Sequence, residues 1–407
     1  MSDQANTPGG WDMVRREPYR ILFPLGMVAA IVGVLLWPLW YAGWLPFYPG
    51  EAHTRMMIEG FMGAFVAGFL GTAGPRLTGS RSWFGGELVL VVVLWLCAVM
   101  CHAHGRVAAG DAVFSALLLV LVMGLAGRWI CGHKDTPPPG FVLVLAGLLG
   151  ALVAAGFLAA STHPAMAHWQ WARLWLFQGF VLLPVMGIGP YLLPRFFGLA
   201  SSHAFEAAPR PPAGWWPRAL AALAAGLLVV ASFALEVAGL VAAGNLLRSG
   251  VILAWFALET PVMQRVQQIA TPGTAVRWAL HALALGCLLA ACWPMARVGA
   301  LHVLFASGLA LLTLTVATRV ILGHAGRHDL LEGRLVWLRW VIGLLVLAAV
   351  TRMTADFLPV VRVSHHVYAA LVWALGGAIW LAAMAKYLWR TADTVKPVRK
   401  CPRRARD

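Results

Sequence analysis

Charged residues are scarce in this chain of 407 residues. Aspartate, glutamate, lysine and arginine make up 12% of it, whereas ordinary soluble domains contain about a quarter. The hydrophobic fraction is 60%, and the mean hydropathy is +0.77. This composition excludes a disordered chain, a fibrous protein and a soluble domain of ordinary make-up, and it predicts a chain that lies mostly in lipid.

Several sequence signatures are also absent. The six cysteines form no C-x-x-C pair, and there is no C-x-x-C-H motif for covalently attached haem. There is no P-loop, no glycine-rich dinucleotide fingerprint and no G-x-S-x-G elbow. The sequence therefore offers neither a disulfide framework nor a common nucleotide or hydrolase site.

Twelve apolar stretches fill most of the chain, and each approaches the roughly 20 residues that a helix needs to cross a bilayer. Backbone groups in hydrocarbon must pair within a helix, so we predict an all-α integral membrane protein that forms a single membrane domain over residues 1–407. Helices 1–6 cover about 21–194, an inner loop about 195–217 and helices 7–12 about 218–389, before a basic cytoplasmic tail at 390–407. The expected spans are 21–42, 54–73, 87–105, 111–131, 140–160, 172–194, 218–242, 246–263, 277–294, 300–322, 335–358 and 364–389.

Lysine and arginine are distributed unevenly between the two sides of these spans. If the N-terminus lies inside, most of them fall on the inner side. The few near outer ends are Arg55, Arg106, Arg173, Arg248, Arg297 and Arg362. The positive-inside rule then predicts that both termini are inside. It also accounts for the net charge of +15 without a nucleic-acid partner, and it makes membrane lipids the expected contact of the basic tail.

Histidine is abundant, with thirteen residues against four lysines. Neutral imidazole is a common ligand of haem iron and copper, and ligands from different helices can converge inside a bundle. For any single histidine, the alternative is an interfacial polar residue. Eight lie near expected outer ends: His53, His102, His104, His163, His168, His302, His365 and His366.

The strongest candidate site is an outer haem held by His53 and His302, which precede their apolar runs and lie at similar depth. Small-residue stripes around Gly60 and Gly63 would leave room for a flat macrocycle, or would serve tight helix packing. This placement is similar to that of haem–copper oxidases, where histidines of helices 2 and 10 hold a haem. His365 or His366 is a substitute ligand or a copper ligand.

Other polar residues have two interpretations each. Cys101, His102 and His104 could hold copper, although their loose spacing favours an interfacial cap. His281 and His324 could form an inner metal or haem site, unless His324 only caps its helix. Two pairs are four residues apart on one helix face, where each predicts an ion pair or an arginine for a haem propionate: Arg352 with Asp356, and Arg55 with Glu59. Glu236 and Glu259 are proton-relay groups or helix contacts.

One segment resembles a known family. His302 to Arg327 contains A-T-R at Ala317–Arg319 and L-G-H-A-G-R at Leu322–Arg327, which is similar to the M-T-R and L-G-H-T-G-R motifs of the NnrS family. Pro18-Tyr19-Arg20 and the run A-G-F-L-G-T-A from Ala67 resemble the family's N-terminal motifs. The resemblance covers the whole chain.

The resemblance implies a bacterial inner-membrane protein that contains haem, b-type by expectation, and copper, and that is linked to nitric oxide and nitrosative stress. The family's H-A-H-E-M motif falls on residues 53–57, where only His53 is kept and Arg55 and Met56 replace the second histidine and the glutamate. The other family positions that carry over as cofactor-binding candidates are His281, His302, His324, Arg319 and Arg352.

Two functions stay open at this stage. The first is an NnrS-like haem protein that binds or reduces NO, or a similar small gas, inside the bilayer. If it reduces NO, it is an oxidoreductase that needs an electron donor. The second is a twelve-helix secondary transporter, or a metal-handling membrane protein, without haem.

Overall fold

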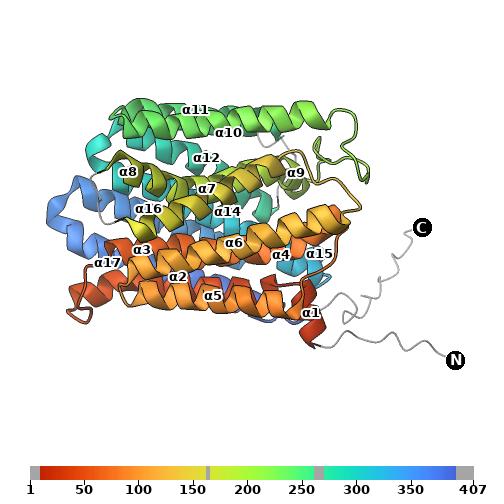
Figure 1. The fold of residues 1–407 in the computed structure, drawn as a ribbon. Coiled ribbons are helices and arrows are strands. Elements are labelled where there is room, and N and C mark those ends of the chain that lie inside the picture. Colours follow the sequence, from red (N-terminus) through yellow and green to blue (C-terminus); the bar gives the residue numbers. More distant parts are fainter. Residues whose placement is uncertain (1–9, 162–165, 261–269, 391–407) are drawn as a thin grey trace, which may run out of the picture.

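A computed structural model gives the structure of residues 10–161, 166–260 and 270–390. These residues form helices and no strand. Twelve of the helical segments are long and apolar enough to cross a membrane (Figure 1). The predicted all-α architecture and the number of spans are therefore confirmed. The tail after Arg390, and residues 261–263 of the expected eighth span, lie outside the described residues.

The twelve spans are numbered in chain order. Spans 2, 6, 10 and 12 are each built from several consecutive helices, and they are longer than the apolar runs alone predict. The spans are α2 (Tyr19–Tyr41), α3–η1–α4 (Gly50–Thr78), α5 (Gly85–Ala103), α6 (Val107–Gly132), α7 (Phe141–Ala160), α8–η2–α9–η3 (Ala167–Phe197), α10 (Trp215–Val237), α11 (Val241–Glu259), α12 (Thr271–Cys292), η5–α13–η6–α14 (Pro294–His324), α16 (Val336–Phe357) and η7–α17 (Pro359–Ala385).

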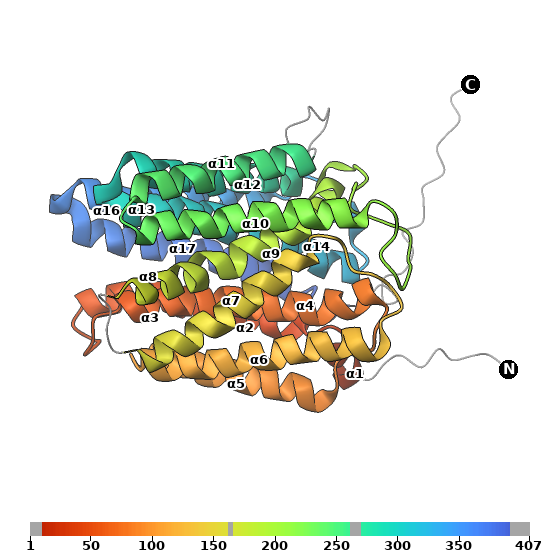
Figure 2. The ribbon, with the colours of Figure 1, turned by 45° about the horizontal axis from the view of Figure 1, so that its top comes forward.

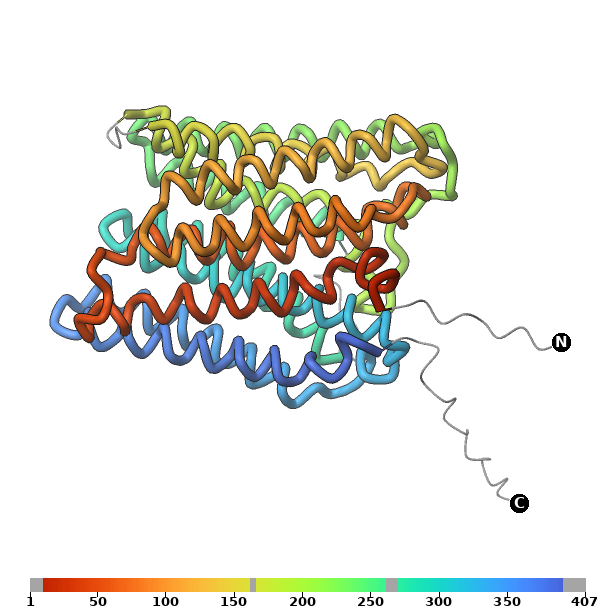
Figure 3. The backbone as a smooth tube through the Cα atoms, turned by 60° about the horizontal axis from the view of Figure 1, so that its bottom comes forward, coloured from red at the N-terminus to blue at the C-terminus, as the bar shows by residue number. Residues whose placement is uncertain are grey.

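Both described ends of the chain lie at the same end of the bundle, as an even number of spans requires (Figures 1 and 3). The short helix α1 (Gly10–Arg16) precedes span 1 there. Arg20, in the first turn of α2, donates a hydrogen bond to the carbonyl oxygen of Leu388 after α17. We call this the proximal end of the bundle, and the opposite end the distal end.

Spans 2, 6 and 10 form the centre of the molecule. In each of them 78% of the most apolar window is buried, against 28–61% in the other nine spans. Figure 2 shows α9 of span 6 lying between α10 on one side and α6 on the other. The outer spans pack in chain order, and the ring closes where α17 contacts α2. The connection between α9 and α10 separates six spans from six, but this burial pattern repeats every four spans.

Each central span also contains a π-helical segment in its distal half. These segments are η1 (Met56–Met62), η2 (Trp175–Gly179) and η6 (Val303–Ala310). A π-helical turn holds one more residue than an α-helical turn, so it changes the direction of the following side chains, and such turns are frequent at functional sites. The distal half of the three central spans is therefore a candidate location for a functional site.

The small-residue stripes of span 2 are filled by neighbouring helices. A side-chain carbon at Gly26 of α2 would lie 2.7 Å from Cβ of Ala64, and one at Gly63 would lie 2.9 Å from the ring of Phe114. One at Gly68 would lie 3.0 Å from the ring of Phe23. These stripes serve tight helix packing, and they leave no space on these faces of α4 (Gly63–Thr78) for a flat macrocycle.

Replacing Gly26 with leucine should therefore destabilise the bundle. The added side chain would overlap Ala64 and approach the carbonyl oxygen of Phe61 at 3.2 Å, and overpacking of this kind costs about 1–3 kcal/mol. We expect a lower midpoint of thermal unfolding for the purified protein. The matched control is Gly343→Leu in α16, because an added Cβ meets open space there. Equal midpoints for the two variants would contradict the packing described.

Several polar contacts hold the connection after span 6 to the bundle, including the hydrogen bonds of Ala208 with Thr136 and Asp135. Nε2 of His203 lies 2.6 Å from a carboxylate oxygen of Glu259 at the end of α11, and Arg218 lies 3.5 Å from the same oxygen. Burial lowers the pKa of His203, so a neutral imidazole donates its N–H to the carboxylate. Glu259 thus acts as a contact between a loop and a helix.

Candidate functional site

His53 lies in the last turn of α3 (Gly50–Arg55), directly before η1. Its Nδ1 atom is 3.0 Å from the carbonyl oxygen of Gly33 in α2, and its ring packs edge-on against Trp37 at a centroid distance of 6.1 Å. A carbonyl oxygen only accepts hydrogen bonds, so Nδ1 carries the proton. Nε2 therefore presents a lone pair, the form in which imidazole binds metals.

His302 occupies the equivalent place in span 10, as the last residue of α13 (Arg297–His302) before η6. Its Nδ1 is 2.7 Å from the carbonyl oxygen of Val298, which fixes the same tautomer. His53, His366 and Arg352 lie in the neighbourhood of His302 at the distal end. Trp37 contacts the rings of both His53 and His366.

His366 of α17 (Arg362–Ala385) completes this group. Its Nδ1 is 2.8 Å from the hydroxyl oxygen of Tyr41, and its ring lies 5.0 Å from that of Trp37. Nε2 of His366 is buried and has no hydrogen-bond partner among the described residues. An unpaired buried nitrogen costs about 1–3 kcal/mol, a cost that a bound metal would remove. We call His53, His302 and His366 the distal histidine cluster.

Arg352 is the cation beside this cluster. It forms an ion pair of 2.7 Å with Asp356 in α16, as their spacing predicts, and Asp356 also accepts the backbone N–H of Gly299 at 2.7 Å. A fixed guanidinium repels a bare metal ion but pairs well with a carboxylate. The cluster therefore fits haem, whose propionates Arg352 would bind, better than it fits copper alone.

His365 does not belong to the distal histidine cluster. Consecutive helical residues point about 100° apart, so His365 faces away from its neighbour. Its Nδ1 lies 3.1 Å from the carbonyl oxygen of Val361, and its ring lies 6.1 Å from that of Tyr368.

The expected copper set Cys101, His102 and His104 does not form a common site. His102 is completely buried, and its Nε2 is 2.8 Å from Oε2 of Glu59. His104 is exposed and bonds the carbonyl oxygen of Met100 at 2.8 Å. His102 thus points into the bundle towards Glu59, whereas His104, which follows the last residue of α5, is exposed. We derive no copper chemistry from them.

The proximal pair His281 and His324 is also separate. His281 is exposed on α12, where its Nδ1 bonds the carbonyl oxygen of Arg277 at 2.7 Å. His324 ends α14 (Leu311–His324), where it hydrogen-bonds Arg76 and lies 3.6 Å from Glu17. Among the described residues, no hydrogen bond, ion pair or ring contact joins the two histidines. His324 bonds the carbonyl oxygen of Val320 at 2.7 Å, which agrees with the alternative of a histidine at a helix end.

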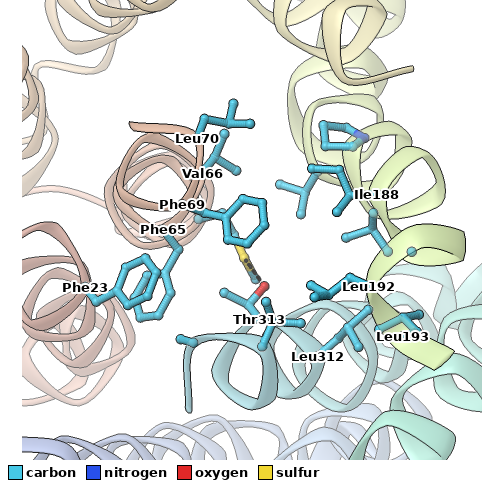
Figure 4. A pocket seen from close by; sticks show the side chains of 17 residues that line it. Phe23, Phe65, Val66, Phe69, Leu70, Ile188, Leu192, Leu193, Leu312 and Thr313 are labelled. Carbon is cyan, nitrogen blue, oxygen red and sulfur yellow. Dashed lines mark hydrogen bonds between the residues drawn. The ribbon is translucent and has the colours of Figure 1, made fainter. Parts of the chain in front are cut away.

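Two cavities lie between the central spans. The one nearer the middle of the bundle has a volume of about 100 Å³, and its lining is apolar except for Thr313 (Figure 4). Figure 4 shows Phe69 of span 2 facing Ile188 of span 6 and Leu312 of span 10, while the ring of Phe65 stacks on that of Phe23. A cavity of this size and polarity suits a small neutral molecule.

The second cavity opens at the proximal end and has a volume of about 420 Å³. Each central span contributes one arginine to its wall, namely Arg76, Arg195 and Arg319. The guanidinium of Arg319 stacks on the ring of Phe196 at 4.9 Å. Arg319, predicted to bind a cofactor, therefore lies at the opposite end of span 10 from His302.

The comparison with known families decides which family the chain represents. The family model described as NnrS protein matches residues 13–391, nearly the whole chain. The chain belongs to the NnrS family. No curated protein matches this sequence.

The motifs that resemble other NnrS sequences converge in space, although they lie on three different spans. Thr72 and Arg76 of span 2, with Arg319 and His324 of span 10, line the proximal cavity. Tyr19 of span 1 lies beside them, with its ring 5.1 Å from that of His324. In this NnrS protein the recognisable motifs surround the proximal cavity, whereas the distal histidine cluster is assembled from single residues.

The partners of the buried charges in this NnrS protein could not be predicted from the sequence. Arg55 does not pair with Glu59; its Nε and Nη2 donate to the two carboxylate oxygens of Asp111 at 2.6 and 2.9 Å. Glu236, which has no local partner in sequence, pairs with Arg248 at 2.9 Å and with Arg297. Each partner lies on another helix, so spacing within one helix carried no signal for it.

Proposed function

We propose that this NnrS protein is an integral membrane haem protein that binds nitric oxide within the bilayer. The observation that carries the proposal is the distal histidine cluster. Three imidazoles from spans 2, 10 and 12 converge there with Nδ1 engaged, and Nε2 of His366 is buried without a partner. Arg352 beside them pairs with Asp356 and would also donate to a haem propionate.

In this proposal two of the three imidazoles would hold the haem iron through Nε2, and NO would bind in place of one of them. When bound, the haem supplies an iron that can bind NO. Trp37 supports both His53 and His366 by ring contacts, and Tyr41 orients His366. We place the distal end outside and both termini inside, as the distribution of lysine and arginine indicates, in the inner membrane of a bacterium.

Nitric oxide is neutral and soluble in lipid, so it needs no polar pathway to reach the interior. The apolar cavity between spans 2, 6 and 10 is of a kind that holds such a molecule (Figure 4). Reduction of NO would consume electrons and protons as well, with the electrons coming from a separate donor. The proposed activity is therefore NO binding, and turnover by an oxidoreductase would be an additional property of the same site.

A visible absorption spectrum of the purified protein tests this proposal. We expect a Soret band, with α and β bands after reduction that identify b-type haem, and a shift of the Soret band when NO is added to the reduced protein. NO consumption with an added electron donor would establish reduction. A colourless, folded protein would contradict the proposal and favour the transporter alternative, for which the proximal cavity is the expected substrate entrance.

A further inference from the structure

A second group of ligand-type side chains lies on the other face of span 2. Glu59 of η1, His102 of α5 and Asp111 of α6 each present one ligand atom, and these atoms lie within 4.8 Å of one another. All three side chains are buried, with exposed fractions of 0–1%. We call them the carboxylate–histidine cluster. It comes from spans 2, 3 and 4, whereas the distal histidine cluster comes from spans 2, 10 and 12.

The hydrogen bonds inside this cluster are incomplete. Nε2 of His102 lies 2.8 Å from Oε2 of Glu59. Oε1 of Glu59 and Nδ1 of His102 are buried and have no partner among the described residues. Buried polar atoms in proteins are nearly always satisfied. The two unpaired atoms are therefore available to a metal ion, a proton or a water molecule.

The charges of the cluster are also unbalanced. Glu59 and Asp111 are two carboxylates. Within the described part of the chain, the only guanidinium in contact with them is that of Arg55, which binds Asp111. Arg55 also contacts Glu51 at 2.5 Å, and Glu51 contacts Arg173 at 2.5 Å. Glu51 thus shares the charge of Arg55, and the buried carboxylates have a net negative charge. Buried negative charge of this kind is balanced either by a bound cation or by a proton.

We propose that Glu59, His102 and Asp111 bind a divalent transition-metal ion. One imidazole nitrogen and two carboxylate oxygens form a donor set that suits Zn²⁺, Mn²⁺ or Fe²⁺. Zinc bonds to such atoms are about 2.0–2.2 Å long, so a small closing of the cluster around the ion would satisfy them. No sulfur ligand belongs to the group, which makes Cu⁺ a poor fit.

The surroundings hold the ligands in place. Arg55 binds both oxygens of Asp111 from the side and would orient this carboxylate, as outer-shell partners of metal ligands do. Gly110 lies directly against the ring of His102. A Cβ atom at this position would lie only 2.1 Å from the imidazole. Nε1 of Trp95 donates to the carbonyl oxygen of Gly60 at 2.8 Å, which fixes η1 beside Glu59.

The metal content of the purified full-length protein tests this assignment. The protein is treated with a chelator, loaded with Zn²⁺ or Mn²⁺, desalted and analysed by mass spectrometry. We expect one tightly bound ion per chain that Glu59→Gln or His102→Gln removes.

The matched controls separate this site from the proposed haem site. His104→Gln removes a nearby exposed histidine and should leave metal binding unchanged. His53→Ala should change the haem spectrum and keep the loaded ion, whereas Glu59→Gln should do the reverse. Size-exclusion chromatography and thermal unfolding confirm that each variant is folded.

Two results would overturn the assignment. One is an ion that remains bound in folded Glu59→Gln and His102→Gln variants. The other is a wild-type protein that takes up neither ion and shows an infrared band of a protonated carboxyl group that Glu59→Gln removes. The second result would mean that a proton, and not a metal, balances the charge of the cluster.

Discussion

His53→Ala and His302→Ala are each expected to abolish or strongly shift the haem spectrum. Both imidazoles are oriented by a backbone carbonyl through Nδ1 and leave Nε2 for iron. Loss of a direct ligand should weaken haem binding by more than the 10–100-fold typical of an outer-shell change. The measurements are the Soret absorbance per chain and the reduced spectrum of each purified variant.

His366→Ala identifies which two of the three imidazoles bind the iron. If His366 is a ligand, its loss changes the spectrum as strongly as the loss of the imidazole with which it pairs. The control is His133→Ala, because His133 is partly exposed at the other end of the bundle, where it stacks on Trp129 at 4.4 Å. Folded His53→Ala and His302→Ala variants with wild-type spectra and haem content would end the proposal.

Arg352→Gln distinguishes haem from copper at the same cluster. If Arg352 pairs with a propionate, its loss weakens haem retention. If the cluster holds a copper ion instead, removal of a nearby positive charge strengthens binding of the metal. Arg352→Gln should therefore lower the haem content if the cluster binds haem, and raise the copper content if the cluster binds copper.

Glu236→Leu is expected to cause the largest loss of stability. Glu236 of α10 pairs with Arg248, whose side chain is completely buried, and with Arg297 of span 10. Arg248 also donates to Gln178 at 2.6 Å and to Ser232 at 2.9 Å. Removing the carboxylate leaves a buried guanidinium without its counterion, and breaking such a pair costs about 3–5 kcal/mol.

Thermal unfolding of the purified variants measures this effect. The double variant Glu236→Gln with Arg248→Gln should recover part of the loss, because neither buried charge is then left alone. The control is Glu332→Leu, which removes an exposed carboxylate from the connection before α16. A Glu236→Leu protein as stable as this control would show that the network contributes little to stability.

Much of the fold could be predicted from the sequence. Twelve apolar runs each near the length of a bilayer leave few alternatives to twelve helices, because an unpaired backbone in lipid is too costly. The runs did not reveal that spans 2, 6 and 10 are central. These spans begin earlier than the apolar runs predict, at Gly50 and Pro294 where 54 and 300 were expected. The added residues 50–53 and 294–299 are more polar than the core of each span, so hydropathy placed the start of each helix too late.

The candidate site was predictable only in part. The depth of His53 and His302 followed from where their apolar runs begin, and the pairing of Arg352 with Asp356 followed from helical spacing. The choice of His366 over His365 did not, since both residues lie in the same turn. It was decided by the rotation of α17, which directs His366 towards Trp37 and Tyr41.

The sequence by itself determined the class of the protein, the number of its spans and its membership of the NnrS family. Length, hydropathy and local motifs are properties of single segments, and they are fully present in the chain. Tertiary structure alone decided that Glu59 meets His102 and Asp111, that Glu236 meets Arg297, and that three arginines share one cavity. Those contacts join different helices, and their formation depends on how each helix is rotated and packed against its neighbours.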